Sequence, residues 1–138
     1  MKEIEIDVVK RIRVKFPRDI HSLLWNYFNG KEQEHFVAVL LNAIHEPTKV
    51  VLVSIGLVNR TLVHPREVFR EAIKDNVVAI VVAHNHPAGS SEPSKEDDEV
   101  TKMLVDAGKV VGIEVLDHMI VSSRGYYSYA ENKFDRIH

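Results

Sequence analysis

The stretch VVAIVVAHNHPAGSSEPSKEDDEV, residues 77–100, decides the fold because it joins a buried strand to a helix around two histidines. Its first seven residues are all apolar and rich in β-branched side chains, which is typical of a strand buried on both faces. From Pro93 onward the sequence has the pattern of a helix start, with Ser94 as a capping residue and acidic residues in the first turn. The loop between them is therefore expected at the carboxyl edge of a sheet.

The rest of the chain predicts further strands and helices around this central strand. Amphipathic spacing predicts three helices, at residues 18–28, 64–76 and 93–112. Apolar or alternating patterns predict additional strands in residues 4–8, 12–16, 34–58 (a hairpin that turns at 45–48), 113–123 and 124–130. The mixed order predicts an α/β (α+β) fold in which helices cover a central mixed β-sheet.

Length and composition limit the classes of protein. The 138 residues show neither repeat nor linker, so we predict a single domain over 1–138, with an amino-terminal strand and helix in 1–30 and a motif-bearing core in 31–138. The absence of cysteine excludes thiolate metal sites and fits a reducing cytoplasm. No apolar segment reaches the length of a signal peptide or membrane span, so a cytoplasmic protein without a membrane partner is expected.

The two histidines of the opening stretch suit a metal site. His84 and His86 stand two residues apart at the end of the predicted strand, so both imidazoles can point to one face and converge. Asp97 lies in the first turn of the following helix, which the loop can return to the strand end. Two imidazoles and a carboxylate leave the fourth position of tetrahedral zinc open, as in catalytic sites. We therefore predict one Zn²⁺ per chain, held by His84, His86 and Asp97.

Several of these residues also have purely structural interpretations. Ser94 and Asp97 are spaced as a capping box, a role that is compatible with catalysis. A single histidine at a strand end is usually a surface or core residue, and only the whole constellation favours a metal. Asp117 precedes His118 in an apolar strand, where an unpaired charge is costly. It is a candidate hydrogen-bond partner for a metal-binding imidazole, with a simple buried polar pair or a place at a strand edge as the alternatives.

The same residues carry a family resemblance. The spacing His84-x-His86, seven residues, Ser94-x-x-Asp97 matches the JAMM motif of JAB/MPN metalloproteases, and HNHPAGSSEPSKEDDEVT (84–101) resembles their RadC branch. Three further stretches extend the resemblance over most of the chain from Glu34 onward: HPREVF (64–69), VLDHMIV (115–121) and GYYSYAE (125–131). Longer RadC proteins carry an amino-terminal helix-hairpin-helix region, so the resemblance is to the catalytic-type domain alone. Ala88 departs from the serine common in this branch but is outside the ligand set.

The resemblance implies a JAB/MPN-type fold of the cytidine-deaminase-like kind and two further site residues. A glutamate at the start of an upstream strand acts as general base in the family, and this position falls on Glu34. On the residues alone, Glu32 and Glu46 are competing carboxylates for that role. The resemblance also implies that Ser94 donates its hydroxyl to the developing oxyanion.

The function that follows is a zinc-dependent hydrolase, a metallopeptidase or isopeptidase acting on a peptide or isopeptide substrate. Two alternatives stay open: a metal-binding interaction module without turnover, and a DNA-repair-associated RadC-type protein. A formal net charge of −2 and the lack of a recognisable DNA-binding motif disfavour a nucleic-acid partner. A nucleobase deaminase is excluded, because those enzymes use cysteine ligands that this chain does not have.

Overall fold

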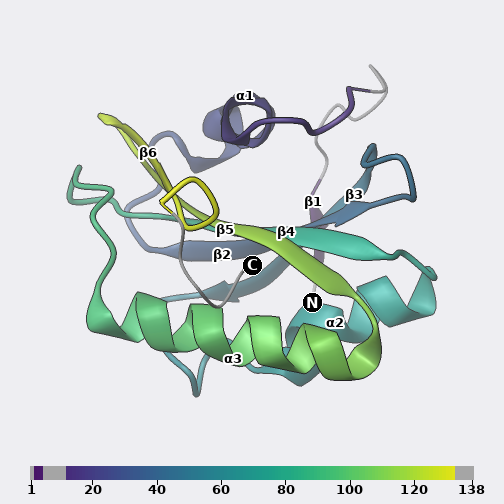
Figure 1. The fold of residues 1–138 in the computed structure, drawn as a ribbon. Coiled ribbons are helices and arrows are strands. Elements are labelled where there is room, and N and C mark those ends of the chain that lie inside the picture. Colours follow the sequence, from purple (N-terminus) through teal and green to yellow (C-terminus); the bar gives the residue numbers. More distant parts are fainter. Residues whose placement is uncertain (1, 5–11, 133–138) are drawn as a thin grey trace.

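The computed structural model describes residues 2–4 and 12–132. In this part of the chain, six strands form one mixed sheet in the order β1-β3-β2-β4-β5-β6 (Figure 1). The strands are β1 (Lys2–Ile4), β2 (His35–Leu41), β3 (Pro47–Ile55), β4 (Ala79–Asn85), β5 (Glu114–Ser122) and β6 (Gly125–Ser128). The helices are α1 (Pro17–Phe28), α2 (Pro65–Lys74) and α3 (Lys95–Val111). This architecture confirms the predicted α/β (α+β) class with a central mixed sheet.

Strand β4 occupies the middle of the sheet and explains the apolar run in the sequence. It pairs antiparallel with β2 on one side and parallel with β5 on the other. Helix α3 forms the crossover between β4 and β5, as a parallel connection requires. The pairing with β5 shifts register between Ile80 and Val81, because Leu116 lies outside the one-to-one pairing of the two strands.

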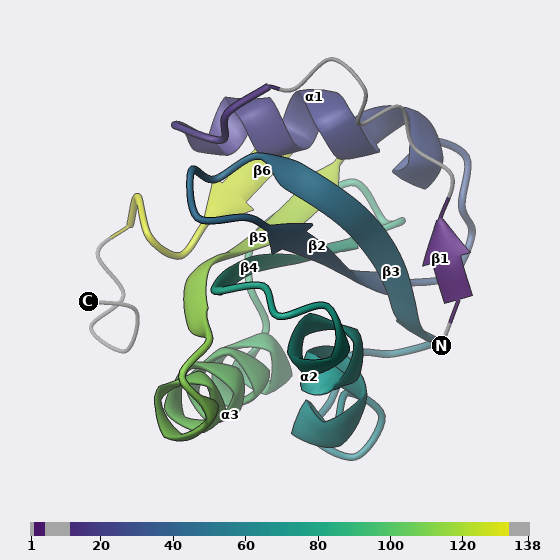
Figure 2. The same ribbon diagram turned by 90° about the vertical axis from the view of Figure 1, so that its right-hand side faces the viewer.

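Helices cover both faces of the sheet (Figure 2). Helix α1 lies over one face, and α2 and α3 lie over the other. The sheet has one apolar cluster on each face, and alternate residues of β4 belong to each. Ile80 and Val82 pack in the cluster with α2 and α3, while Val81 and Ala83 pack in the cluster with α1. Because both faces of β4 are buried, every residue of its strand pattern must be apolar until the histidines begin.

One strand prediction is wrong. Residues 12–15, the described part of the second alternating stretch, form no strand, and Phe16 is a bend that precedes α1. The Val14 amide donates instead to the carbonyl of His45 at the β2–β3 turn, at 2.8 Å. Ile12 and Phe16 are exposed, so their alternation does not mark a buried sheet face. Of the first alternating stretch, Ile4 lies in β1, and the remainder falls outside the described residues.

The helices themselves are short and amphipathic. None of those found within residues 2–4 and 12–132 combines the length with the apolar character that a bilayer crossing needs. Helix α2 begins with Pro65 after His64, whose Nδ1 accepts from the Arg66 amide at 3.1 Å. Helix α3 ends at Val111 and is capped by Gly112, which adopts the left-handed conformation with φ of 78°.

Candidate metal centre

The site is built at the carboxyl end of β4. His84 is fully buried, and its ring stacks on Phe36 of the neighbouring β2 with ring centroids 5.8 Å apart. His86 follows two residues later, and its amide donates to the carbonyl of Val121 on β5 at 2.9 Å. Both side chains leave the strand on the face that α3 covers, as their spacing requires. Their Nε2 atoms lie 3.2 Å apart.

Asp97 completes a compact group of ligand atoms. Its Oδ1 lies 3.1 Å from the Nε2 of His84, and its Oδ2 lies 3.1 Å from the Nε2 of His86. A tetrahedral zinc ion with bonds of 2.0–2.1 Å spaces its ligand atoms about 3.3 Å apart. The two nitrogens and the carboxylate therefore have the spacing and the donor chemistry that fit such an ion. The structure brings together all three residues that the sequence proposed as ligands.

Asp97 is held in place by the start of α3. The Ser94 amide donates to Asp97 Oδ2 at 2.9 Å, and the Asp97 amide donates to Ser94 Oγ at 3.1 Å. This reciprocal pair is a capping box, which satisfies two amides that the first helical turn leaves unpaired. The cap thus has a second consequence, because it fixes the carboxylate that faces the histidines. Ser94 is an exposed residue, and its hydroxyl, which accepts from the Asp97 amide, retains its own proton for donation.

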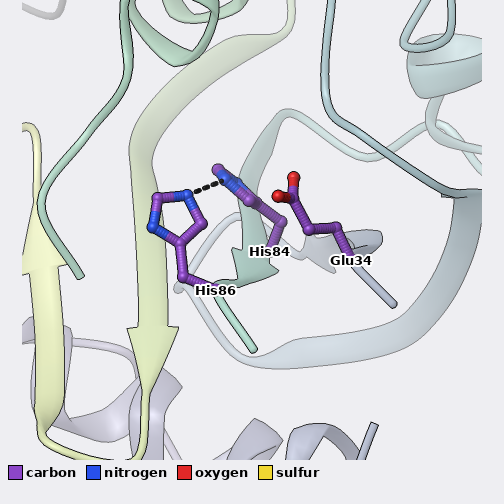
Figure 3. Close-up of side chains that lie close together, drawn as sticks. All are labelled: Glu34, His84 and His86. Carbon is purple, nitrogen blue, oxygen red and sulfur yellow. Dashed lines mark hydrogen bonds between the residues drawn. The ribbon is translucent and has the colours of Figure 1, made fainter. Parts of the chain in front are cut away.

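Glu34 approaches the histidines from the segment before β2 (Figure 3). One ligand atom from each of Glu34, His84 and His86 lies within 4.8 Å of the other two. Glu34 Oε1 accepts from the Val58 amide at 3.1 Å, and its backbone carbonyl accepts from the Gly56 amide at 2.8 Å. The carboxylate is therefore tied at one oxygen to the β3–α2 loop, while it faces the two imidazoles.

Asn85, between the two histidines, also positions Glu34. Its Oδ1 accepts from the His35 amide at 2.6 Å, and its Nδ2 donates to the Gln33 carbonyl at 3.0 Å. These two bonds hold the backbone on either side of Glu34. Sequence reasoning missed this role, although an asparagine that ends an otherwise apolar buried strand is itself a signal, because a buried amide needs partners.

Comparison with known proteins agrees with this geometry. A family model described as the RadC-like JAB domain matches residues 14–134, which is most of the chain. The chain belongs to the RadC-like JAB family. This membership confirms the family resemblance that the sequence motifs indicate.

Relatives of this RadC-like JAB domain are bacterial proteins named UPF0758. The chain is 47% identical over 123 residues to one from Alkaliphilus metalliredigens, an alignment that covers 89% of this chain and 53% of the relative. It is 46% identical over 119 residues to one from Rubrobacter xylanophilus, covering 86% of this chain and 52% of the relative. The chain therefore spans about half the length of the curated relatives it matches.

The other carboxylates proposed from the sequence lie elsewhere in the RadC-like JAB domain. Glu46 accepts from the side chain of Asn42 at 3.1 Å in the β2–β3 turn. Glu32 is exposed and lines a pocket beside α1 whose lining also includes His86. Asp117 accepts from Ser128 Oγ at 2.5 Å and from the amides of His118 and Ala130 at 2.8 and 3.0 Å. Its carboxylate is thus engaged at the β5–β6 hairpin and the segment after it.

The side chain that lies against the Nδ1 of His84 is His118. The Nε2 of His118 lies 2.9 Å from the Nδ1 of His84, on the side away from Asp97. Burial lowers the pKa of His118 well below its usual value, and the charge of His84 acts in the same direction. His118 is therefore neutral in the folded protein at neutral pH. Sequence reasoning placed this contact one residue too early, at Asp117.

Electrostatics favour a cation between the ligand groups. Burial by itself would raise the pKa of Asp97, but its hydrogen bonds with His84 and His86 hold the pKa far below the usual range. Burial likewise opposes the charged form of His86, but the bonds to Asp97 and to the Ser90 carbonyl outweigh it and raise the His86 pKa. Asp97 is therefore an anion, and its hydrogen bonds with the two histidines compensate its charge.

A cleft of about 560 Å³ opens over the site of this RadC-like JAB domain. Glu34, His86, Ser94 and Asp97 all line it; Ser94 is exposed and Glu34 and His86 are half-buried, whereas Asp97 is buried. Val58 and the exposed side chain of Leu57 form an apolar stretch of its wall. His84 is fully buried and does not line the cleft, so it lies below the cleft floor.

Proposed function

We propose that the chain is the catalytic-type domain of a zinc-dependent hydrolase that cleaves peptide or isopeptide bonds. The observation that carries this proposal is the convergence of His84 Nε2, His86 Nε2 and the Asp97 carboxylate within 3.2 Å of one another, with the Glu34 carboxylate beside them. Nitrogen and oxygen ligands in this number suit zinc and leave one position open. A zinc ion bound there supplies a Lewis acid and makes water acidic enough to attack at neutral pH.

His86 meets the requirement that a metal-binding imidazole be unprotonated on the nitrogen that faces the metal. Its Nδ1 lies 2.9 Å from the carbonyl of Ser90, which can only accept, so this nitrogen carries the proton. When the ring holds only this proton, its lone pair is on Nε2, the nitrogen that lies 3.1 Å from Asp97 Oδ2. A backbone carbonyl behind a histidine is the usual arrangement for a metal ligand.

Glu34 and Ser94 then have complementary roles in the cleft. Because Glu34 faces the two histidines, its carboxylate can take a proton from water there and pass it to the leaving amine. The Val58 amide holds one carboxylate oxygen and keeps it oriented. Ser94 lines the same cleft, and its hydroxyl donates to the oxygen of the carbonyl under attack, on which negative charge develops.

The first experiment measures metal and turnover together in protein purified without a histidine tag. Wild-type protein should hold about one zinc per chain, and His86→Ala and Asp97→Ala should lose it while staying folded. Glu34→Gln should keep the zinc but lower the hydrolysis of a verified peptide or isopeptide substrate by about a hundredfold or more. Glu32→Gln is the matched control, because it removes the same charge two residues away, on an exposed side chain.

The results separate the proposed roles. Full activity in Glu34→Gln would refute the general base, and loss of activity in Glu32→Gln alone would move the role to that residue. Wild-type protein that stays folded but takes up no added zinc would refute the hydrolase. A domain that only mediates interactions would then be the better interpretation.

A further inference from the structure

A chain of buried polar groups runs from His84 into the core beneath the site. The Nδ1 of His84 lies 2.9 Å from the Nε2 of His118, and the Nδ1 of His118 lies 2.6 Å from Thr101 Oγ1. The Thr101 hydroxyl in turn donates to the backbone carbonyl of Asp97 at 2.8 Å. His84 and His118 are fully buried, and Thr101 is 1% exposed. Because water does not reach these groups, the hydrogen bonds within the chain must satisfy them.

The last bond of the chain defines one of two proton arrangements. When the Thr101 hydroxyl donates to the Asp97 carbonyl, which can only accept, the Thr101 oxygen accepts from His118. The Nδ1 of His118 then carries the single proton of its neutral ring, which leaves a lone pair on Nε2. That lone pair accepts from His84, whose proton is thereby on Nδ1. His84 Nε2 is left with a free lone pair, on the side that faces Asp97 and His86.

We propose that Thr101 and His118 are positioning residues that set the tautomer of His84 so that its Nε2 can bind a metal. This inference rests on the metal centre proposed above. The two proposed ligands are then oriented by different groups. His86 is oriented by the Ser90 carbonyl, which can only accept a hydrogen bond. His84 is oriented by the neutral His118, which can either accept or donate. Only the His84 support is therefore reversible.

The opposite proton arrangement of this chain has hydrogen-bond partners when no metal is bound. If Thr101 donates to His118 instead, His118 donates to His84, and His84 carries its proton on Nε2, where Asp97 Oδ1 accepts at 3.1 Å. No group in the chain gains or loses charge in this exchange, because each imidazole keeps one proton. Metal binding at His84 thus selects one of two proton arrangements and needs no buried charge to form.

Thr101 matters most when the metal is bound. In that arrangement its oxygen is the acceptor for His118 Nδ1–H, and valine, which has nearly the same shape, would leave that donor unpaired. In the reversed arrangement valine leaves only a lone pair unpaired, which proteins tolerate better than an orphaned N–H. Thr101→Val should therefore weaken zinc binding about tenfold, as loss of a group that orients a metal ligand typically does. Thr101→Ser keeps the hydroxyl and should bind zinc about as tightly as wild type.

The test measures zinc affinity by competition with a chromophoric chelator and the thermal unfolding of each metal-free protein. Thr48→Val is the matched control, because the Thr48 hydroxyl also donates to a backbone carbonyl, that of Leu40, at 3.3 Å. This bond is remote from the site, since Leu40 pairs with Ile80 at the opposite end of β4 from the histidines. Weaker zinc binding by Thr101→Val alone, with a metal-free melting temperature close to that of Thr101→Ser, supports the proposal. Equal zinc affinity in the two Thr101 variants overturns it.

A second measurement needs no substitution. In zinc-loaded wild-type protein, the ¹⁵N shifts of the His118 ring should show a protonated Nδ1 and an unprotonated Nε2. The opposite assignment would overturn the proposal even if zinc binds. Wild-type protein that binds no zinc would overturn the metal centre as well, so the failure of the two proposals can be told apart.

Discussion

Replacing Asp117 with asparagine should change how the stability of the fold depends on pH. Asp117 is 7% exposed, and burial raises its pKa from 3.8 to about 6, although Ser128 and two backbone amides donate to its carboxylate. A raised pKa in the folded state means that the folded protein holds a proton that the unfolded chain has released. The free energy of unfolding therefore falls as pH rises between the two pKa values.

The size of the effect follows from the shift. A difference of about two pKa units corresponds to about 3 kcal/mol, of which about 2 kcal/mol is lost between about pH 4.5 and about pH 7.5. Asparagine can accept the same amide bonds and donate to Ser128, but it does not ionise. The stability of Asp117→Asn relative to wild type should therefore increase by about 2 kcal/mol over that interval.

The assay is urea unfolding of both proteins at several pH values, with a chelator present so that bound metal does not contribute. Asp106→Asn removes a carboxylate from the exposed side of α3 and reports the effect of net charge alone. A difference between wild type and Asp117→Asn that stays constant across the pH range would refute the reasoning that burial of this carboxylate is costly.

Three further substitutions test how the site is supported, each by chemical denaturation with a second readout where given. Ser94→Ala should lower the free energy of unfolding by about 1 kcal/mol through loss of the helix cap, and should lower turnover with little loss of metal. Ser94→Thr should preserve stability and turnover. Unchanged stability in the alanine variant would contradict the capping role. Asn85→Ala should cost about 1–3 kcal/mol, because backbone groups that flank Glu34 lose their partner, while zinc content stays near one per chain; an equally stable variant would contradict this. Gly108→Ala should lower the free energy of unfolding by about 1–3 kcal/mol, because the added Cβ would lie 2.4 Å from the Ile113 carbonyl oxygen. Helix propensity alone predicts a gain in stability, and such a gain would refute the packing argument.

The sequence predicts the ligand group because local rules determine most of its geometry. Two-residue periodicity brings His84 and His86 to one face of a strand that must be buried. Capping chemistry fixes Ser94 and Asp97 at the start of the next helix. The remaining requirement, that the loop returns this helix to the strand end, follows from the crossover that parallel strands need.

The contact between His118 and His84 could not be predicted, because it depends on a bulge in β5. Val115 packs on the face that α2 and α3 cover, and strict alternation from it would bring Asp117 to that face. The register shift at Leu116 brings His118 there instead, where it reaches Thr101 of α3. Similarly, the alternation in residues 12–16 looked like a strand, but alternation cannot show whether a partner strand is adjacent. Both differences arise from pairing between distant segments rather than from local preference.

The position of β4 between β2 and β5 also determines when, during synthesis, the candidate metal site can first be complete. A nascent chain that has emerged as far as α3 already contains His84, His86 and Asp97, but β5 has not yet emerged. It therefore lacks His118, and β4 is unpaired along one side. The site unites segments far apart in the chain, and such contacts form late because of the loop-closure entropy they require. If the proposed centre binds a metal, we therefore expect capture only after β5 has emerged, and a ribosomal product truncated before β5 would lack the stabilisation that metal binding gives the complete domain.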